Sequence, residues 1–179
     1  MNVPNALTVL RVLLVPILVV ALLDRTEGGD VLAAAVFAFA SITDAADGWW
    51  ARSRDLVTTF GKVVDPIADK LLVLASLGTL VSLERLPLWV ALVVLAREAA
   101  VTLARARVGV VIPAVTWGKV KTGVQVLTIL LLILFDPSPA WLDGLVLVMV
   151  AVTVASGIDF FVKLRGQRPA ASSHSRAEV

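Results

Sequence analysis

The stretch SITDAADGWWARSRDLVTTFGKVVDPIADK, residues 41–70, connects two long apolar segments and carries a pair of aspartates toward each of its ends. The two segments, residues 31–51 and 63–83, are each long enough to cross a hydrocarbon core, which takes about 20 helical residues. Between them, residues 53–62 are polar and read as a short loop. Because a short loop forces neighbouring helices to run antiparallel, the stretch predicts a membrane helical hairpin with acids near its turn.

The same pattern continues in both directions along the chain. Of the 179 residues, 59% are hydrophobic, and the mean hydropathy of +0.93 exceeds what a soluble domain of this length can bury. Further apolar segments cover residues 5–23, 87–106, 119–135 and 141–163. We therefore predict an all-α membrane protein with six transmembrane helices in one domain, residues 1–165, followed by a disordered cytoplasmic tail, residues 166–179.

The basic residues gather at one set of segment ends. This set holds eleven lysines and arginines, whereas Arg25 and Arg85 lie at the other ends. The positive-inside rule then places both termini in the cytoplasm, and it places the two aspartate pairs of residues 41–70 on the same side. The membrane that we expect is the inner cell membrane. Since the cations do not form one soluble face, anionic lipid or a phosphorylated substrate fits better than nucleic acid. The eleven are Arg52, Arg54, Lys62, Lys70, Arg105, Arg107, Lys119, Lys121, Lys163, Arg165 and Arg168.

Four aspartates form the candidate reactive centre. Asp44 and Asp47 are three residues apart, and Asp65 and Asp69 are four apart, so on helices each pair shares a face. An aspartate inside a membrane helix costs about 2.5 to 3.5 kcal/mol, and four together also repel, so a cation must compensate. The chain has no cysteine, and its one histidine, His174, lies in the polar tail. Hard oxygen ligands of this kind suit Mg²⁺ or Mn²⁺, and two such ions commonly promote displacement at phosphorus.

Other interpretations of the same residues stay open at this stage. The aspartates can cap helices or pair with Arg52, Lys62 and Lys70 at the membrane interface, or they can line a proton or cation pathway in a transporter. A purely structural subunit is a third class. Gly48 and Ala51, which share the face of the first aspartate pair, give room for a diphosphate or allow close helix packing.

Taken together, Asp44-x-x-Asp47-Gly48-x-x-Ala51-Arg52, eight residues, then Gly61-x-x-x-Asp65-x-x-x-Asp69 resembles the signature of the CDP-alcohol phosphotransferase family at every defined position. The resemblance implies a six-helix membrane enzyme, commonly a homodimer, in which a hydroxyl group displaces CMP from a CDP-linked alcohol. It implies two divalent ions, Mg²⁺ or Mn²⁺, on Asp44, Asp47, Asp65 and Asp69, with Asp69 as the catalytic general base. The CDP-binding residues that it implies are Asn5, Thr8, Asp47, Gly48, Ala51, Arg52 and Gly61.

The resemblance extends beyond the signature. Residues 3–16, 61–70 and 97–125 are most similar to the members that transfer the phosphatidyl group of CDP-diacylglycerol to sn-glycerol 3-phosphate. This similarity implies those two substrates, together with membrane lipid, as partners. Members that use inositol phosphate or phosphatidylglycerol as the acceptor share the signature and stay open as alternatives.

A phosphorylated acceptor needs cationic donors next to a carboxylate-rich site. We expect four residues to supply them: Arg97, Arg105, Lys119 and Lys121. Arg97 lies deep within its segment and needs a partner, which is either Glu98 or a bound phosphate. For residues at segment ends, ordinary positive-inside anchoring is the competing interpretation, and we favour it for Arg107 and Lys163.

Overall fold

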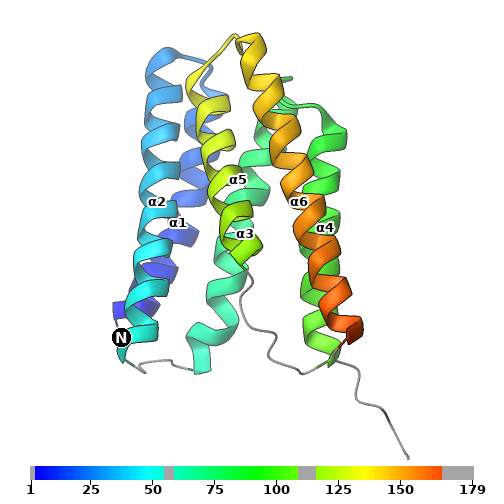
Figure 1. Cartoon of the computed structure of the whole chain (residues 1–179). Coiled ribbons are helices and arrows are strands. Elements are labelled where there is room, and N and C mark those ends of the chain that lie inside the picture. The colour runs from blue at the N-terminus through cyan, green and yellow to red at the C-terminus, as the bar shows by residue number, and fades with distance from the viewer. Residues whose placement is uncertain (1–2, 55–58, 109–115, 167–179) are drawn as a thin grey trace, which may run out of the picture.

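A computed structural model gives the fold for residues 3–54, 59–108 and 116–166, and it describes side chains within 9–43, 70–107 and 118–166. The described chain consists of six α-helices and no strand, as Figure 1 shows. The helices are α1 (Val3–Leu23), α2 (Glu27–Arg54), α3 (Thr59–Ser82), α4 (Leu88–Val108), α5 (Thr116–Leu134) and α6 (Ala140–Gly166). Each helix covers one predicted apolar segment, with ends that differ by at most four residues.

The starts of α2 and α3 each come four residues before the predicted ones, and α2 begins at Glu27 where hydropathy predicted residue 31. Thr26 explains the earlier start because its Oγ1 accepts a hydrogen bond from the Gly29 backbone amide at 3.0 Å, as an N-cap residue does. Glu27 and Asp30 then place negative charge in the first turn, where the helix dipole favours it. Polar capping therefore extends the helix beyond its apolar portion.

A left-handed residue ends α3. Glu84 has φ of 61°, its amide bonds the Val81 carbonyl at 3.0 Å, and the Arg85 amide bonds the Leu80 carbonyl at 2.9 Å. These two bonds form a Schellman motif, which satisfies carbonyls that the end of a helix leaves without partners. Pro87 follows, and the chain turns directly into α4.

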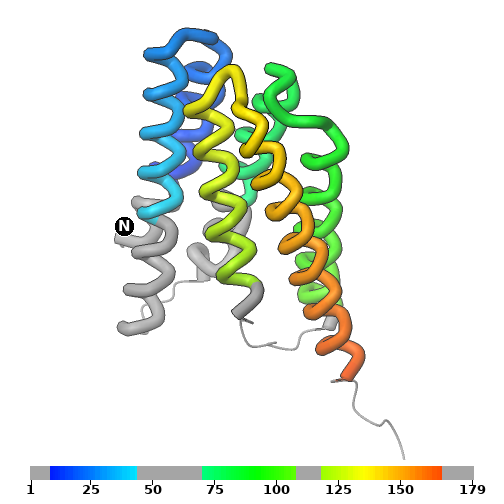
Figure 2. The backbone as a smooth tube through the Cα atoms, turned by 45° about the horizontal axis from the view of Figure 1, so that its top comes forward, coloured from blue at the N-terminus to red at the C-terminus, as the bar shows by residue number. Residues whose placement is uncertain are grey.

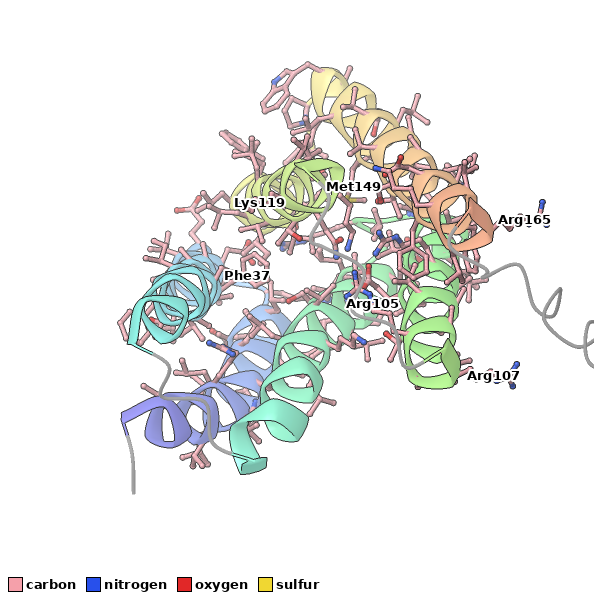
Figure 3. The ribbon with its side chains drawn as sticks, turned by 60° about the horizontal axis from the view of Figure 1, so that its bottom comes forward. Phe37, Arg105, Arg107, Lys119, Met149 and Arg165 are labelled. Atoms are coloured by element: carbon pink, nitrogen blue, oxygen red, sulfur yellow. The ribbon has the colours of Figure 1, made fainter. Side chains whose placement is uncertain are left out.

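The helices form a bundle in which α1 packs against α2 and α3, α5 against α2 and α6, and α4 against α6 (Figures 1 and 2). The centre is apolar, and Phe37 and Met149, both fully buried, belong to it (Figure 3). Large apolar side chains also cover much of the outside. Among those more than half exposed are Leu13, Val20, Val31, Ile42, Leu103, Leu147 and Val162.

One helix in the described part of the chain, α6, is both long and apolar enough to cross a membrane. Shorter apolar stretches lie at Val9–Leu23 and Lys70–Ser82. The all-helical architecture is thus confirmed, whereas six membrane crossings and the cytoplasmic position of the termini stay predictions. The predicted tail lies outside the described residues apart from Gly166, which ends α6.

Ion pairs made by the buried Arg85 connect the helices at one end of the bundle. Arg85 donates two hydrogen bonds to the Asp30 carboxylate, at 2.9 and 3.0 Å, and its Nη2 lies 2.6 Å from an Asp136 oxygen. Its Nη1 also reaches the Ile133 carbonyl at 3.3 Å. We call Arg85, Asp30 and Asp136 the Arg85 cluster; it joins the start of α2, the α3–α4 connection and the end of α5.

Candidate active site

The end of the bundle opposite the Arg85 cluster carries both aspartate pairs. There α2 ends at Arg54 and α3 begins at Thr59, while α1 begins and α6 ends at the same end (Figure 1). Asp44 lies ten residues before the end of α2, and Asp69 lies ten residues after the start of α3. At a rise of 1.5 Å per residue, both backbone positions are about 15 Å inside the helix ends. Because α2 and α3 run in opposite directions, the backbone positions of the two pairs lie at similar depths (Figure 1).

The side chains of these aspartates lie outside the described part of the structure. The same is true of every residue that the resemblance assigns to CDP binding: Asn5, Thr8, Asp47, Gly48, Ala51, Arg52 and Gly61. Within the described residues, no three His, Cys, Asp or Glu side chains are grouped so that they hold a metal ion. The roles given to Asp44, Asp47, Asp65 and Asp69 thus stay predictions, and their oxygen donors match what Mg²⁺ or Mn²⁺ prefers.

Arg11 is a described neighbour of this region. It is buried, at 4% exposure, on α1, one turn after Thr8. It lines a small space with Ala40 and Thr43 of α2, directly before Asp44 in the sequence. A buried guanidinium is therefore present between α1 and α2 at the level where the first aspartate pair begins.

The predicted acceptor residues Arg97 and Lys121 are brought together by Glu98. Glu98 Oε1 accepts a hydrogen bond from Lys121 Nζ at 2.5 Å and another from Arg97 Nη1 at 2.8 Å. The three side chains are mostly buried, with exposures of 8% for Lys121, 16% for Arg97 and 24% for Glu98. Two cations on one carboxylate leave a net charge of about +1 within the bundle. The expectation that Arg97 needs Glu98 or a phosphate is met here by Glu98.

Helix α6 holds the other side of Arg97. Ser156 Oγ accepts a hydrogen bond from Arg97 Nη2 at 2.9 Å and donates one to the Thr153 carbonyl at 3.1 Å. Next to it, Gly157 leaves space for the arginine stem, because a Cβ at that position would lie 3.2 Å from Arg97 Cγ. We call Arg97, Glu98, Lys121 and Ser156 the Glu98 cluster; it joins α4, α5 and α6.

The remaining predicted acceptor residues lie nearer the helix ends. Arg105 is exposed, and its guanidinium carbon lies 5.3 Å from the centre of the Phe160 ring, a cation–π distance. Viewed from this end, Arg105 lies inside the ring of helices, whereas Arg107 and Arg165 point away from it (Figure 3). Lys119 is exposed near the start of α5. The Glu98 cluster and Arg105 thus occupy successive levels within the bundle.

A polar contact connects the helix of Asp69 to this cationic region. Lys70, the residue that follows Asp69, donates a hydrogen bond from Nζ to Thr102 Oγ1 on α4. Thr102 in turn donates to the Glu98 backbone carbonyl at 2.7 Å. Because Lys70 is adjacent to Asp69, this contact influences how α3 is rotated relative to α4 at the level of the aspartates.

A wide hollow in the described part of the protein lies elsewhere. It is an open apolar groove of about 900 Å³ between α1 and α2, next to the Asp24–Gly29 connection. Its lining is apolar side chains such as Ile17, Val20 and Leu32, with Asp24 as the charged group. Such a groove has no set of convergent donors for a phosphate, so we do not place the reaction there.

Sequence reasoning missed the contribution of α6 next to Arg97 and one pairing within the Glu98 cluster. Ser156 and Gly157 are small residues in an apolar helix, and nothing local indicates that they face Arg97. The pairing of Lys121 with Glu98 was also not predicted, since 23 positions separate them in the chain. The available signal was general: a charged residue deep in an apolar segment requires a partner from another helix.

Comparison with known proteins agrees with the signature. Residues 1–161 match the family described as CDP-alcohol phosphatidyltransferase. A Bacillus subtilis protein named CDP-diacylglycerol–glycerol-3-phosphate 3-phosphatidyltransferase is 39% identical, covering 90% of this chain and 94% of its own length. A Pseudomonas fluorescens protein of the same name is 38% identical, covering 95% and 90%. A Mycobacterium tuberculosis protein named "Probable phosphatidylglycerophosphate synthase" is 40% identical, covering 90% and 81%. The chain belongs to the CDP-alcohol phosphatidyltransferase family.

Proposed function

We propose that this enzyme transfers the phosphatidyl group of CDP-diacylglycerol to sn-glycerol 3-phosphate, forming phosphatidylglycerophosphate and CMP in phospholipid biosynthesis. The observation that carries the proposal is the set of relatives named for this reaction, which align with about 90% of the chain. The cationic Glu98 cluster supports it further, since a phosphorylated acceptor requires such donors.

The aspartates carry the chemistry of transfer. Asp44, Asp47, Asp65 and Asp69 hold two divalent ions, which when bound neutralise the diphosphate and stabilise the negative charge of departing CMP. Asp69 accepts the proton of the acceptor's primary hydroxyl. The hydroxyl oxygen then forms a bond to the phosphorus that bears diacylglycerol, and the bond from that phosphorus to the CMP oxygen breaks. Asn5, Thr8, Gly48, Ala51, Arg52 and Gly61 surround the cytidine diphosphate.

The acceptor enters among the basic residues of α4 and α5. Arg105 and Lys119 are exposed near the helix ends and attract the dianion first. Arg97 and Lys121 lie deeper and are fixed by Glu98, so they hold the phosphate while the hydroxyl faces Asp69. Orientation of this kind lowers the barrier because the reacting atoms are already close.

We place the enzyme in the inner cell membrane with six crossings and both termini in the cytoplasm. Large apolar side chains exposed on the outside of the bundle support contact with lipid. The basic helix ends around the aspartates support a cytoplasmic active site. A homodimer completes the proposal, carried over from the family resemblance, and cross-linking in native membranes tests it.

The experiment that tests the function compares acceptors. Purified protein in detergent with Mg²⁺ and CDP-diacylglycerol is offered glycerol 3-phosphate, inositol 1-phosphate, free inositol or phosphatidylglycerol, and CMP release is measured. We expect release with glycerol 3-phosphate and none in Asp69→Asn. Preference for another acceptor would keep the family and refute this substrate. Absence of release with every acceptor from folded protein would refute the enzymatic proposal.

A further inference from the structure

The Glu98 cluster crosses a part of the bundle where backbone packing is sparse. Helix α5 packs mainly against α2 and α6, and α4 packs mainly against α6 and α3, so α4 and α5 are not a close helix pair. The Lys121–Glu98 bond of 2.5 Å nevertheless joins them directly. The pair therefore holds two helices at a set separation across the interior of the bundle.

Buried polar side chains gather near this level of the bundle. Toward the Arg85 cluster, the buried residues of α4, α5 and α6 are mostly apolar, whereas around the Glu98 cluster polar residues are buried beside the apolar Val101 and Phe160. The apolar set toward the Arg85 cluster is Val90, Ala91, Val94, Ile129, Leu132, Ile133, Leu142, Val146 and Met149, and the polar set is Lys121, Gln125, Thr128, Thr153 and Ser156. The Glu98 cluster thus lies among the buried polar side chains of these three helices.

Three buried polar atoms near the Glu98 cluster have no hydrogen-bond partner among the described residues. They are Arg97 Nε on α4, Gln125 Oε1 on α5 and Thr153 Oγ1 on α6. Gln125 and Thr153 are 3% and 0% exposed. Buried polar groups in native proteins are normally satisfied by protein, water or ligand. Gln125 and Thr153 lie about one helical turn from Lys121 and Ser156, so unsatisfied polar atoms adjoin the Glu98 cluster on all three helices, which supports a polar floor beside the apolar core.

We propose that Glu98 is a positioning residue for the acceptor: it holds Arg97 and Lys121 as a fixed pair of donors at the floor of the acceptor site. The inference rests on the proposed function, because it assumes an acceptor that carries a phosphate. Arg97 and Lys121 repel each other, and without the shared carboxylate oxygen they would separate. A site whose donors are ordered before binding loses less entropy when the anion arrives. Glu98 itself does not contact the phosphate, since both are negative.

Truncation of the carboxylate gives the first test. Glu98→Ala is expected to raise the KM for glycerol 3-phosphate at least tenfold while the KM for CDP-diacylglycerol changes less than twofold. Glu98→Gln keeps an acceptor oxygen in place, so its effect on the acceptor KM is expected to be smaller. Asp159→Asn is the matched control, because it removes the exposed Asp159–Lys163 pair within α6 alone and is expected to change neither constant.

Exchanging the charges of Glu98 and Lys121 distinguishes a role in positioning the acceptor from a role in stability alone. The double variant Glu98→Lys with Lys121→Glu keeps an ion pair between α4 and α5 but moves the cation to the other helix. We expect it to recover most of the melting temperature lost in Lys121→Glu while the acceptor KM stays at least tenfold raised. Recovery of both stability and acceptor KM would show that the pair is only structural and would overturn the proposal.

Binding without turnover keeps this test independent of the proposed reaction. Titration calorimetry with glycerol 3-phosphate is expected to show affinity at least tenfold weaker in Glu98→Ala than in the wild-type protein, with the Asp159→Asn control unchanged. If the wild-type protein binds glycerol 3-phosphate but releases no CMP, the proposed function fails. The ratio of the glycerol 3-phosphate affinities of the wild-type protein and Glu98→Ala still decides the role of Glu98. Equal affinity in Glu98→Ala, or no binding by the wild-type protein, would overturn the role of Glu98.

Discussion

The guanidinium of Arg85 binds both oxygens of the Asp30 carboxylate, at 2.9 and 3.0 Å, with 5% of the arginine side chain exposed. This bidentate pair joins the start of α2 to the α3–α4 connection at the end of the bundle farthest from the aspartates. The geometry divides the molecule into an end held by the largely buried Arg85–Asp30 pair and an end that carries the two aspartate pairs. The two ends should therefore respond differently to substitution.

Arg85→Ala is expected to destabilise the protein while leaving acceptor selectivity unchanged. Removing one partner of a largely buried ion pair costs about 3 to 5 kcal/mol because the remaining carboxylate stays buried and uncompensated. Thermal unfolding in detergent measures the loss. Arg25→Lys is the control, since Arg25 is exposed at the same end. An unchanged melting temperature in Arg85→Ala would contradict the role given to this pair.

Two glycines of α6 should differ in how they tolerate a side chain. At Gly157, added atoms meet the stem of Arg97 at 3.2 Å, whereas at Gly144 nothing lies within 4 Å of an added Cβ. Gly157→Val is expected to displace Arg97 and raise the acceptor KM severalfold. Gly144→Ala is expected to stabilise the protein by about 0.5 to 1 kcal/mol, because alanine has less freedom to lose. An equal KM for the acceptor in the two variants would show that Arg97 keeps its hydrogen bonds when a side chain is added at position 157.

Arg105 and Arg107 form a matched pair at one helix end. Arg105 lies inside the ring of helices against Phe160, and Arg107 points away from the bundle (Figure 3). Arg105→Gln is expected to raise the acceptor KM about tenfold, equivalent to about 1.4 kcal/mol of binding. Arg107→Gln is expected to leave it within twofold. Steady-state kinetics at fixed CDP-diacylglycerol provides the comparison, and a larger effect at Arg107 would reverse our assignment.

Removal of divalent ions should abolish transfer. Chelation with EDTA is expected to stop CMP release, and Mg²⁺ or Mn²⁺ added in excess is expected to restore it, because four aspartates cannot hold a diphosphate without cations. Asp65→Asn is expected to require a higher Mg²⁺ concentration, with Asp143→Asn, an exposed residue of α6, as the control. Full activity in EDTA would show that the acids serve another purpose.

Much of the fold follows from hydropathy, because an α-helix of about 20 apolar residues crosses the hydrocarbon core and satisfies its own backbone hydrogen bonds there. All six helices were predicted on this basis. The start of α2 was placed four residues late because hydropathy does not report the hydrogen bonds of Thr26. The Arg85 cluster was not predicted either, since its three members, one at the start of α2 and two in separate connections, lie far apart in the chain.

The site was predictable to a smaller extent. The depth of Arg97 in an apolar segment required a partner, and Glu98, its neighbour, was one of two named options. The bond from Lys121 to the same oxygen depends on how α5 is placed relative to α4, which spacing within one helix does not reveal. Ser156 was missed for the same reason, because small residues on α6 gave no indication of which helix they face.

The most direct test of the central claim follows an isotope label from acceptor to lipid. Purified enzyme receives CDP-diacylglycerol, Mg²⁺ and ¹³C-labelled glycerol 3-phosphate, and mass spectrometry measures labelled lipid and CMP. We predict labelled phosphatidylglycerophosphate and CMP in equal amounts, with neither formed by Asp69→Asn. CMP without labelled lipid, or no reaction from folded protein, would contradict the account.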